Sequence, residues 1–198
     1  MLNLKLLLII VLFPSLSNAQ QVALSFDDAP MRSMATFTGM KRTELLINIL
    51  KEYNLKTVFF SNSKKFSKDN GLLRMKKYDK AGHFIANHTH SHPDFNKMST
   101  ESYINNVKTA DKLLRQFEHF RPWFRYPFLH RGNTIEKRDS MQAYLEETGY
   151  KNGYVTLDTQ DWFMASLLND AVASRRRLNK TNPFTAYSAL VWDTMTHD

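Results

Sequence analysis

Short apolar runs alternate with amphipathic segments along most of the chain. Five runs have the length and the composition of strands: residues 22–26, 57–60, 83–86, 123–126 and 154–157. Four segments between them carry apolar residues at helical spacing: residues 43–53, 72–81, 100–117 and 135–148. The sequence from Ser166 onward is also mostly helical in pattern. Repeated strand–helix units predict an α/β fold with parallel strands and outer helices.

The helix expected at 100–117 has the clearest pattern. Ser99 or Thr100 can cap its first turn with a side-chain oxygen. One face of this helix is then apolar, and it consists of Tyr103, Val107, Ala110, Leu114 and Phe117. Two of the other predicted helices end at a glycine, Gly82 and Gly149.

Polar and ionisable residues gather directly after the predicted strands. These residues are Asp27 and Asp28, the segment 88–92, Arg125, and Asp158 with Asp161. Parallel α/β sheets and barrels place their functional sites at the carboxyl ends of the strands. We therefore expect four clusters that are distant along the chain to converge on one face of the molecule.

Asp27 and Asp28 are adjacent carboxylates at the end of a predicted strand. Side chains alternate in direction at this spacing, so one carboxylate could bind a metal ion while the other accepts a proton. Taken alone, an Asp-Asp-Ala-Pro segment is more often a turn or a helix cap.

The segment 88–92 contains His88, His90 and His92. A helical turn would put His88 and His92 on one face, where their imidazoles suit zinc or a similar divalent ion, while His90 would point elsewhere. Two imidazoles and one carboxylate leave coordination positions open, which is typical of a catalytic metal that acidifies a water molecule. The alternatives are a solvated histidine-rich loop and a loose metal-scavenging tract.

Composition narrows these possibilities. The 198 residues are 42% hydrophobic and 23% charged, which indicates one globular core. The chain has no cysteine, so a metal site must use histidine and carboxylate ligands, and a thiol nucleophile is excluded. The net charge of +8 fits either an anionic polymer partner or simple solubility, and because no nucleic-acid motif accompanies it we predict no nucleic-acid partner.

The first nineteen residues have the pattern of a secretory signal. One positive charge within residues 1–5 is followed by an apolar run at 6–13 and by small residues up to Ala19. This run is shorter than the roughly 20 residues that a membrane-spanning helix needs. We therefore predict a signal peptide at 1–19, a catalytic domain at 20–198, and export to a periplasm or the cell exterior without a membrane span.

Four segments together resemble the polysaccharide deacetylases of carbohydrate esterase family four. The family patterns are Thr-Phe-Asp-Asp-Gly-Pro, His-Ser/Thr-x-x-His, Arg-x-Pro-aromatic and Asp-x-x-Asp-Trp. They are similar, in the same order, to residues 25–30, 88–92, 125–128 and 158–162. Each motif alone is weak, but four in the right order, each at a predicted strand end, are specific.

The resemblance implies roles for these residues. Asp27 would be the catalytic base, and Asp28, His88 and His92 would hold a divalent metal ion, most often Zn²⁺, with Co²⁺ or Ni²⁺ as alternatives. Arg125 would orient the base. The implied fold is a distorted (β/α)7-type barrel.

The same resemblance implies a substrate groove. Pro127 and Phe128 would shape it, and a backbone N–H near Phe128 would hold the developing oxyanion. Asp161 would tune the general-acid histidine, and Trp162 would line the pocket for the acetyl methyl group.

Two features depart from the family pattern. Ala29 replaces the usual glycine of the first motif, which requires a backbone conformation that an L-residue tolerates. The fifth family motif, Leu-x-His, supplies the general acid, but the only histidine after Trp162 is His197, in a poorly matching context. We therefore expect a barrel that is incomplete at its C-terminal end.

These observations favour metal-dependent hydrolysis of N-acetyl groups on an amino-sugar polymer such as peptidoglycan or chitin. One alternative is a glycan-binding relic without turnover, since the general acid is missing. Another is an O-acetyl esterase of the same family, whose alkoxide leaving group needs less protonation than an amine. The sequence leaves the oligomeric state open.

Overall fold

A computed structural model describes residues 22–174 of the chain. The five strands are β1 (Ser25–Ala29), β2 (Val58–Ser61), β3 (Phe84–Asn87), β4 (Phe120–Phe124) and β5 (Lys151–Asn152). The α-helices are α1 (Gly39–Glu52), α2 (Gly71–Lys80), α3 (Thr100–Leu114), α4 (Ile135–Glu147) and α5 (Asp161–Ala173). Three 3₁₀ helices connect them: η1 (Ser63–Ser67), η2 (Phe95–Lys97) and η3 (Pro127–Leu129).

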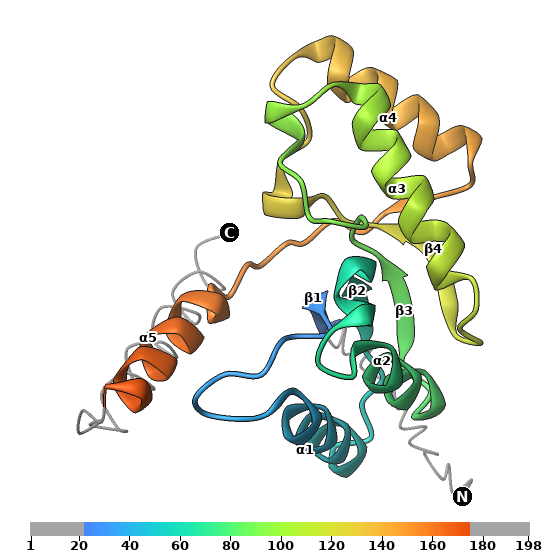
Figure 1. The fold of residues 1–198 in the computed structure, drawn as a ribbon. Helices are drawn as coiled ribbons and strands as arrows, with labels where there is room; N and C mark the ends of the chain where they lie inside the picture. Colours follow the sequence, from blue (N-terminus) through green and yellow to red (C-terminus); the bar gives the residue numbers. More distant parts are fainter. Residues whose placement is uncertain (1–21, 175–198) are drawn as a thin grey trace, which may run out of the picture.

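The strands form one parallel sheet in the order β1-β2-β3-β4-β5. Helices α1 and α2 pack beside the first part of the sheet, and α3 and α4 pack beside the second part (Figure 1). A sequential strand order without reversal is that of a barrel, whereas a doubly wound sheet reverses its order at a switch point. The predicted α/β fold with a parallel, barrel-type sheet is confirmed.

The core consists of two apolar clusters that α3 joins. Ala110 and Leu114 pack in the cluster shared by α1, α2 and the first strands, while Tyr103 and Val107 pack in the cluster shared with α4. The whole face predicted for this helix, including Phe117, is buried. Ser99 caps the helix by accepting a hydrogen bond from the backbone N–H of Ser102.

Several element boundaries differ from the predicted ones by a few residues. Helix α1 begins at Gly39 instead of residue 43 because the hydroxyl of Thr38 accepts from the backbone N–H of Lys41 and caps an earlier start. Gly82 and Gly149 follow α2 and α4 with φ of 79° and 73°, left-handed conformations that suit glycine at a helix end.

The strand predicted at 154–157 is wrong. Strand β5 is only Lys151–Asn152, and residues 153–160 form no strand. Its neighbour β4 is paired through Phe124 with Asn152, and the backbone N–H of Gly153 donates to the oxygen of Phe124 at 2.7 Å. After Phe124 the chain turns into η3, and the pairing ends there. β-Branched composition alone therefore does not produce a strand here.

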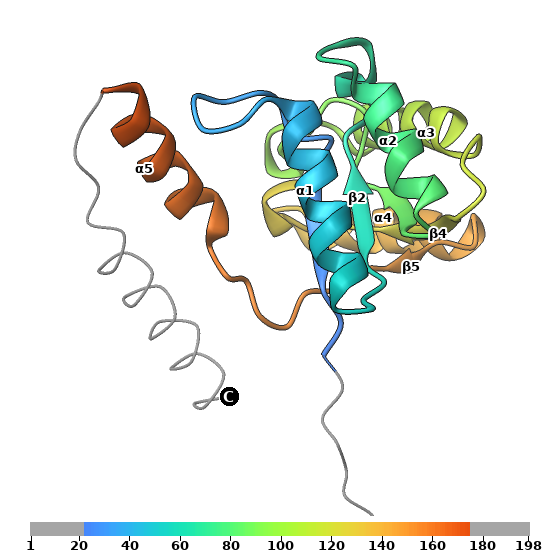
Figure 2. The same ribbon diagram turned by 90° about the horizontal axis from the view of Figure 1, so that it is seen from below.

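Helix α5 begins at Asp161, earlier than the predicted residue 166, and follows an extended connection. It lies apart from the sheet in both views (Figures 1 and 2). The side chain of Asn169 accepts a hydrogen bond from the backbone N–H of Ala35 at 2.7 Å, which ties the helix to the loop before α1. Within residues 22–174, no helix combines the length and the apolar character needed to cross a bilayer.

Candidate active site

A β-bulge separates the two neighbouring carboxylates at the end of β1. The register of β1 on β2 shifts between Phe26 and Ala29, so that β1 has one residue more than its partner over this stretch. Asp28 has a left-handed φ of 61°. Because of the bulge, Asp27 and Asp28 meet different partners across the sheet. Ala29 is buried and is not in the left-handed region, so alanine is tolerated where the family has glycine.

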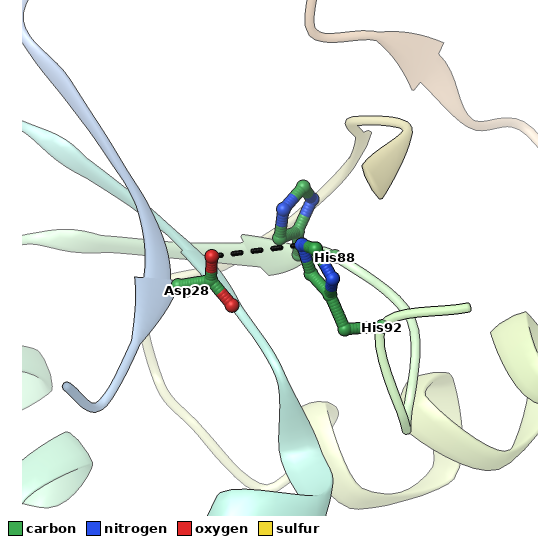
Figure 3. Close-up of side chains that lie close together, drawn as sticks. All are labelled: Asp28, His88 and His92. Carbon is green, nitrogen blue, oxygen red and sulfur yellow. Dashed lines mark ion pairs between the residues drawn. The ribbon is translucent and has the colours of Figure 1, made fainter. Parts of the chain in front are cut away.

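Asp28, His88 and His92 come together at the carboxyl ends of β1 and β3. One donor atom from each side chain lies within 4.8 Å of the others. Asp28 faces the two imidazoles, and its Oδ2 lies 3.5 Å from Nε2 of His92 (Figure 3). Asp28 thus meets two predicted site residues that lie at least sixty positions further along the chain, as expected from parallel strand ends.

The segment between the two histidines is a turn without helical structure, so the predicted helical arrangement is wrong. Thr89 and His92 have left-handed φ of 69° and 57°, and these conformations bring the rings of His88 and His92 to a centroid separation of 5.0 Å. His90 points elsewhere, with its Nδ1 2.9 Å from the hydroxyl of Ser63.

His88 is held in the form that a metal ligand requires. It is buried, and its Nδ1 lies 2.8 Å from the backbone oxygen of Arg125. Since a carbonyl oxygen only accepts, Nδ1 carries the proton and Nε2 keeps its lone pair for the site. Burial lowers the pKa of His88 despite the nearby charges of Asp27 and Asp28, which keeps the ring neutral.

Asp28 has a cationic neighbour, Lys65, that no motif predicts. Burial acts to raise the pKa of Asp28, but the ammonium charge of Lys65 is the largest of the opposing effects, which together lower this pKa. Nζ of Lys65 donates to Oδ1 of Asp28 at 2.8 Å and to its backbone oxygen at 2.9 Å. Oδ1 is thus occupied by the ammonium group, while Oδ2 faces His92.

Arg125 fixes the other carboxylate. Its Nη1 donates to Oδ1 of Asp27 at 2.6 Å and to the hydroxyl of Ser25 at 2.8 Å, and its Nε donates to the backbone oxygen of Gly153 at 2.7 Å. The buried guanidinium also stacks on the ring of Phe60 at 3.9 Å. The second oxygen of Asp27 lies 4.0 Å from Nε2 of His88, so this carboxylate borders the cluster.

Pro127 and Phe128 follow Arg125 at the rim of the site. Pro127 is buried, whereas Phe128 is 57% exposed and has a left-handed φ of 56°. The Phe128 ring lies edge-on to His92 with a centroid separation of 4.6 Å. An accessible aromatic surface therefore adjoins the candidate metal ligands.

Asp161 and Trp162 lie at the start of α5 and not at a strand end. Partial desolvation raises the pKa of Asp161, and the charges of Asp158 and Asp27 act in the same direction, although Asp161 as a whole is solvent-accessible. Trp162 is 62% exposed and packs against Phe163. Its role in an acetyl pocket stays a prediction, as does the role of Asp161.

The family model described as polysaccharide deacetylase matches residues 16–153, and the chain belongs to this family. It is 29% identical to the peptidoglycan-N-acetylglucosamine deacetylase of Bacillus cereus over 149 residues, which are 73% of this chain and 47% of that protein. It is also 29% identical to the chitin deacetylase of Colletotrichum lindemuthianum over 147 residues, covering 71% and 52% of the two chains.

Solved structures show the same fold. The chitin deacetylase of Colletotrichum lindemuthianum matches with a TM-score of 0.56 at 24% identity, covering 71% of this chain and 57% of that one. A pseudoenzyme of the same esterase family from Bacillus anthracis matches with a TM-score of 0.57 at 18% identity, covering 74% and 47%. The chain spans about half the length of the known relatives named above.

Proposed function

We propose that this chain hydrolyses N-acetyl groups of an amino-sugar polymer, using a divalent metal ion held by Asp28, His88 and His92. The observation that carries the proposal is the cluster of these three side chains beside a second carboxylate, Asp27, which Arg125 holds in place. Family membership supports the same reaction class.

The donor set fits a catalytic divalent ion. Ligand bonds of about 2.1 Å in tetrahedral geometry separate the donor atoms by roughly 3.4 Å. Nε2 of His92 and Oδ2 of Asp28 are 3.5 Å apart, close to that separation. Two neutral imidazoles and one carboxylate favour zinc over calcium or magnesium, and three ligands leave positions for water and substrate.

The bound ion would supply Lewis-acid chemistry, polarising the acetyl carbonyl and making water more acidic. Asp27 would accept a proton from the attacking water as the water oxygen bonds to the carbonyl carbon. Its Oδ1 is held by Arg125, which leaves Oδ2 toward the cluster for this purpose. The backbone N–H of Phe128 would donate to the developing oxyanion.

The leaving amine also needs a proton when the carbon–nitrogen bond breaks. The family resemblance implies that a late histidine supplies this proton. In this sequence the only histidine after Trp162 is His197, which lies outside the described residues. In our proposal Asp27 returns the proton that it took from water.

The remaining assignments follow from the family pattern. Pro127, Phe128 and Trp162 would contact the acetylated sugar, and Asp161 would act on the proton donor. Related proteins are named for peptidoglycan and chitin, which supports an acetylated glucosamine polymer as substrate. The signal peptide proposed at 1–19 lies outside the described residues and would deliver the domain at 20–198 to an exported location.

The test is acetate release from chitooligosaccharides by the purified chain supplied with Zn²⁺ or Co²⁺. Asp27→Asn should reduce the rate by at least about 10²-fold, because the amide cannot accept the water proton. Asp139→Asn, at an exposed position on α4, is the matched control and should leave the rate unchanged. If the metal-loaded chain released acetate from the oligosaccharides no faster than the metal-free chain does, the proposal would be contradicted.

A second candidate is a glycan-binding protein without turnover, which the same cluster of side chains and the exposed Phe128 ring beside it would also suit. Calorimetry would then detect metal and oligosaccharide binding while acetate release stayed at background. An O-acetyl esterase would instead release acetate from an aryl acetate or acetylated xylan faster than from N-acetylated oligomers.

A further inference from the structure

Four consecutive backbone N–H groups in the turn between the two histidine ligands donate to side chains. The N–H of Thr89 donates to Oδ1 of Asn87 at 2.8 Å, and the N–H of His92 donates to the hydroxyl of Thr89 at 3.0 Å. These two bonds close the turn on itself, because their acceptors belong to the same segment of chain.

Asn106, on α3, accepts the two bonds in the middle. Its Oδ1 lies 2.9 Å from the backbone nitrogen of His90 and 3.0 Å from that of Ser91. Its Nδ2 donates to the hydroxyl of Ser91 at 2.8 Å. One amide therefore makes three hydrogen bonds to the tip of the turn and links it to another element.

The helix that carries Asn106 is a rigid support. Tyr103, Val107, Ala110 and Leu114 on α3 are completely buried, so the core fixes the position of this helix. A turn that contains left-handed residues at Thr89 and His92 is conformationally costly. On its other side the backbone N–H of Lys64 donates to the oxygen of His90 at 2.8 Å, but that bond leaves the N–H groups of the turn to Asn106. The three hydrogen bonds of Asn106 therefore attach the turn to a helix whose position the core fixes.

We propose that Asn106 is a positioning residue that sets the metal affinity of the site without contacting the ion. By fixing the N–H groups of His90 and Ser91, it holds the rings of His88 and His92 in the mutual geometry that meets Asp28. This inference rests on the proposed metal site and adds a residue to it. Partners outside the ligand shell typically account for 10–100-fold in metal affinity.

The chain offers a closely matched control. Asn105 is the preceding residue on the same helix and is exposed, and its backbone oxygen accepts from Thr109. Asn106→Ala removes the amide from the turn, while Asn105→Ala makes the same chemical change outside the turn. Asn106→Asp keeps an oxygen that can accept from both N–H groups, loses the donor to Ser91 and adds a negative charge near the site.

The experiment measures Co²⁺ or Zn²⁺ affinity of the purified full chain by calorimetry, together with the visible spectrum of bound Co²⁺. Asn106→Ala should weaken binding by roughly 10–100-fold and alter the Co²⁺ spectrum, whereas Asn105→Ala should stay within about twofold of the wild type. Asn106→Asp should restore the wild-type Co²⁺ spectrum that Asn106→Ala alters, because the acceptor that positions the turn is retained; its added charge would raise the affinity in either case. Should the alanine variant fail to fold, Asn106→Gln, which displaces the amide by one methylene, takes its place.

A purely structural role would lower the unfolding free energy of the metal-free protein and leave metal affinity and the Co²⁺ spectrum unchanged. Wild-type affinity in Asn106→Ala would therefore overturn this inference alone. Failure of the wild-type chain to bind any divalent ion would overturn the proposed metal site and this inference together, so the two failures are distinguishable.

Discussion

Asp27 and Asp28 illustrate how neighbouring residues of the same type acquire different environments. Asp27 is paired with the guanidinium of Arg125, and Asp28 with the ammonium group of Lys65 and the imidazole of His92. The bulge in β1 lies at these two residues, and their carboxylates contact groups from different parts of the chain. This difference supports separate duties for them, one in proton transfer and one in metal binding.

The positive charge of Lys65 should have a measurable effect on the pKa of the Asp28 carboxyl. Lys65→Met removes a cation 2.8 Å from Oδ1, so the pKa of the Asp28 carboxyl in the metal-free protein should rise. Carboxyl carbon chemical shifts followed by NMR over a pH titration would report it. Lys64→Met, at the adjacent exposed lysine, is the control. An equal effect of both substitutions, or no effect of either, would argue against the specific pairing.

His83 should make stability depend on pH in the weakly acidic range. It is buried with an unpartnered Nδ1, and burial, followed by the charges of Lys56 and His119, lowers its pKa from 6.5. The unfolded chain then binds more protons below pH 6.5, so the unfolding free energy falls as pH decreases from 6.5 toward the folded-state pKa. His83→Phe should flatten this dependence in urea titrations at several pH values. An unchanged slope would show that His83 does not cause it.

At the level of elements, the connection after β4 holds two successive residues in a conformation that side chains disfavour. Phe128 and Leu129 both have φ of 56°. This conformation directs the Phe128 ring toward His92, and a left-handed residue with a side chain costs roughly 1–2 kcal/mol. The energetic cost falls at the rim of the candidate site, which is where strained backbone is commonly found.

A glycine series would measure this strain. Leu129→Ala and Leu129→Gly remove the same packing contacts, but only glycine adopts φ of 56° without a steric penalty. Glycine normally destabilises relative to alanine, yet here we expect Leu129→Gly to be the more stable variant by about 1 kcal/mol. Chemical denaturation would give the unfolding free energies of both variants. A higher unfolding free energy for Leu129→Ala than for Leu129→Gly would contradict the left-handed backbone at this residue.

Elements set by local pattern were predictable from the sequence. The buried face of α3 and its cap at Ser99 follow from residue spacing, which is a local property. Strand β5 was not predictable in this way, because it ends at the residue opposite Phe124 of β4. Whether a β-branched segment pairs depends on its neighbour in the sheet and not on its own composition.

In the candidate site, too, some residues were predictable from the sequence and others depended on the folded structure. The motifs predicted Asp28, His88 and His92 as neighbours because strand ends of a parallel sheet converge. Lys65 and Asn106 were missed since an isolated lysine or asparagine carries no pattern, and their significance appears only when η1 and α3 are placed against the site. The left-handed turn that joins the two histidines also has no signal in their spacing.

On the scale of the whole molecule, the candidate site combines residues from two strands that are not neighbours in the sheet. Asp28 comes from β1, whereas His88 and His92 follow β3, with β2 between the two strands. An ion shared by these ligands would join both strands and stabilise the folded state, since the unfolded chain has no preformed site.

The most direct measurement is therefore a Zn²⁺ titration of the purified metal-free chain, following heat of binding and thermal unfolding together. We predict one ion per chain and a rise in the unfolding temperature, with both effects lost in Asp28→Asn and in the double variant His88→Gln, His92→Gln. The Asp139→Asn control should keep both effects. Binding that survives in the Asp28 and histidine variants, or no binding by the unmodified chain, would contradict the account.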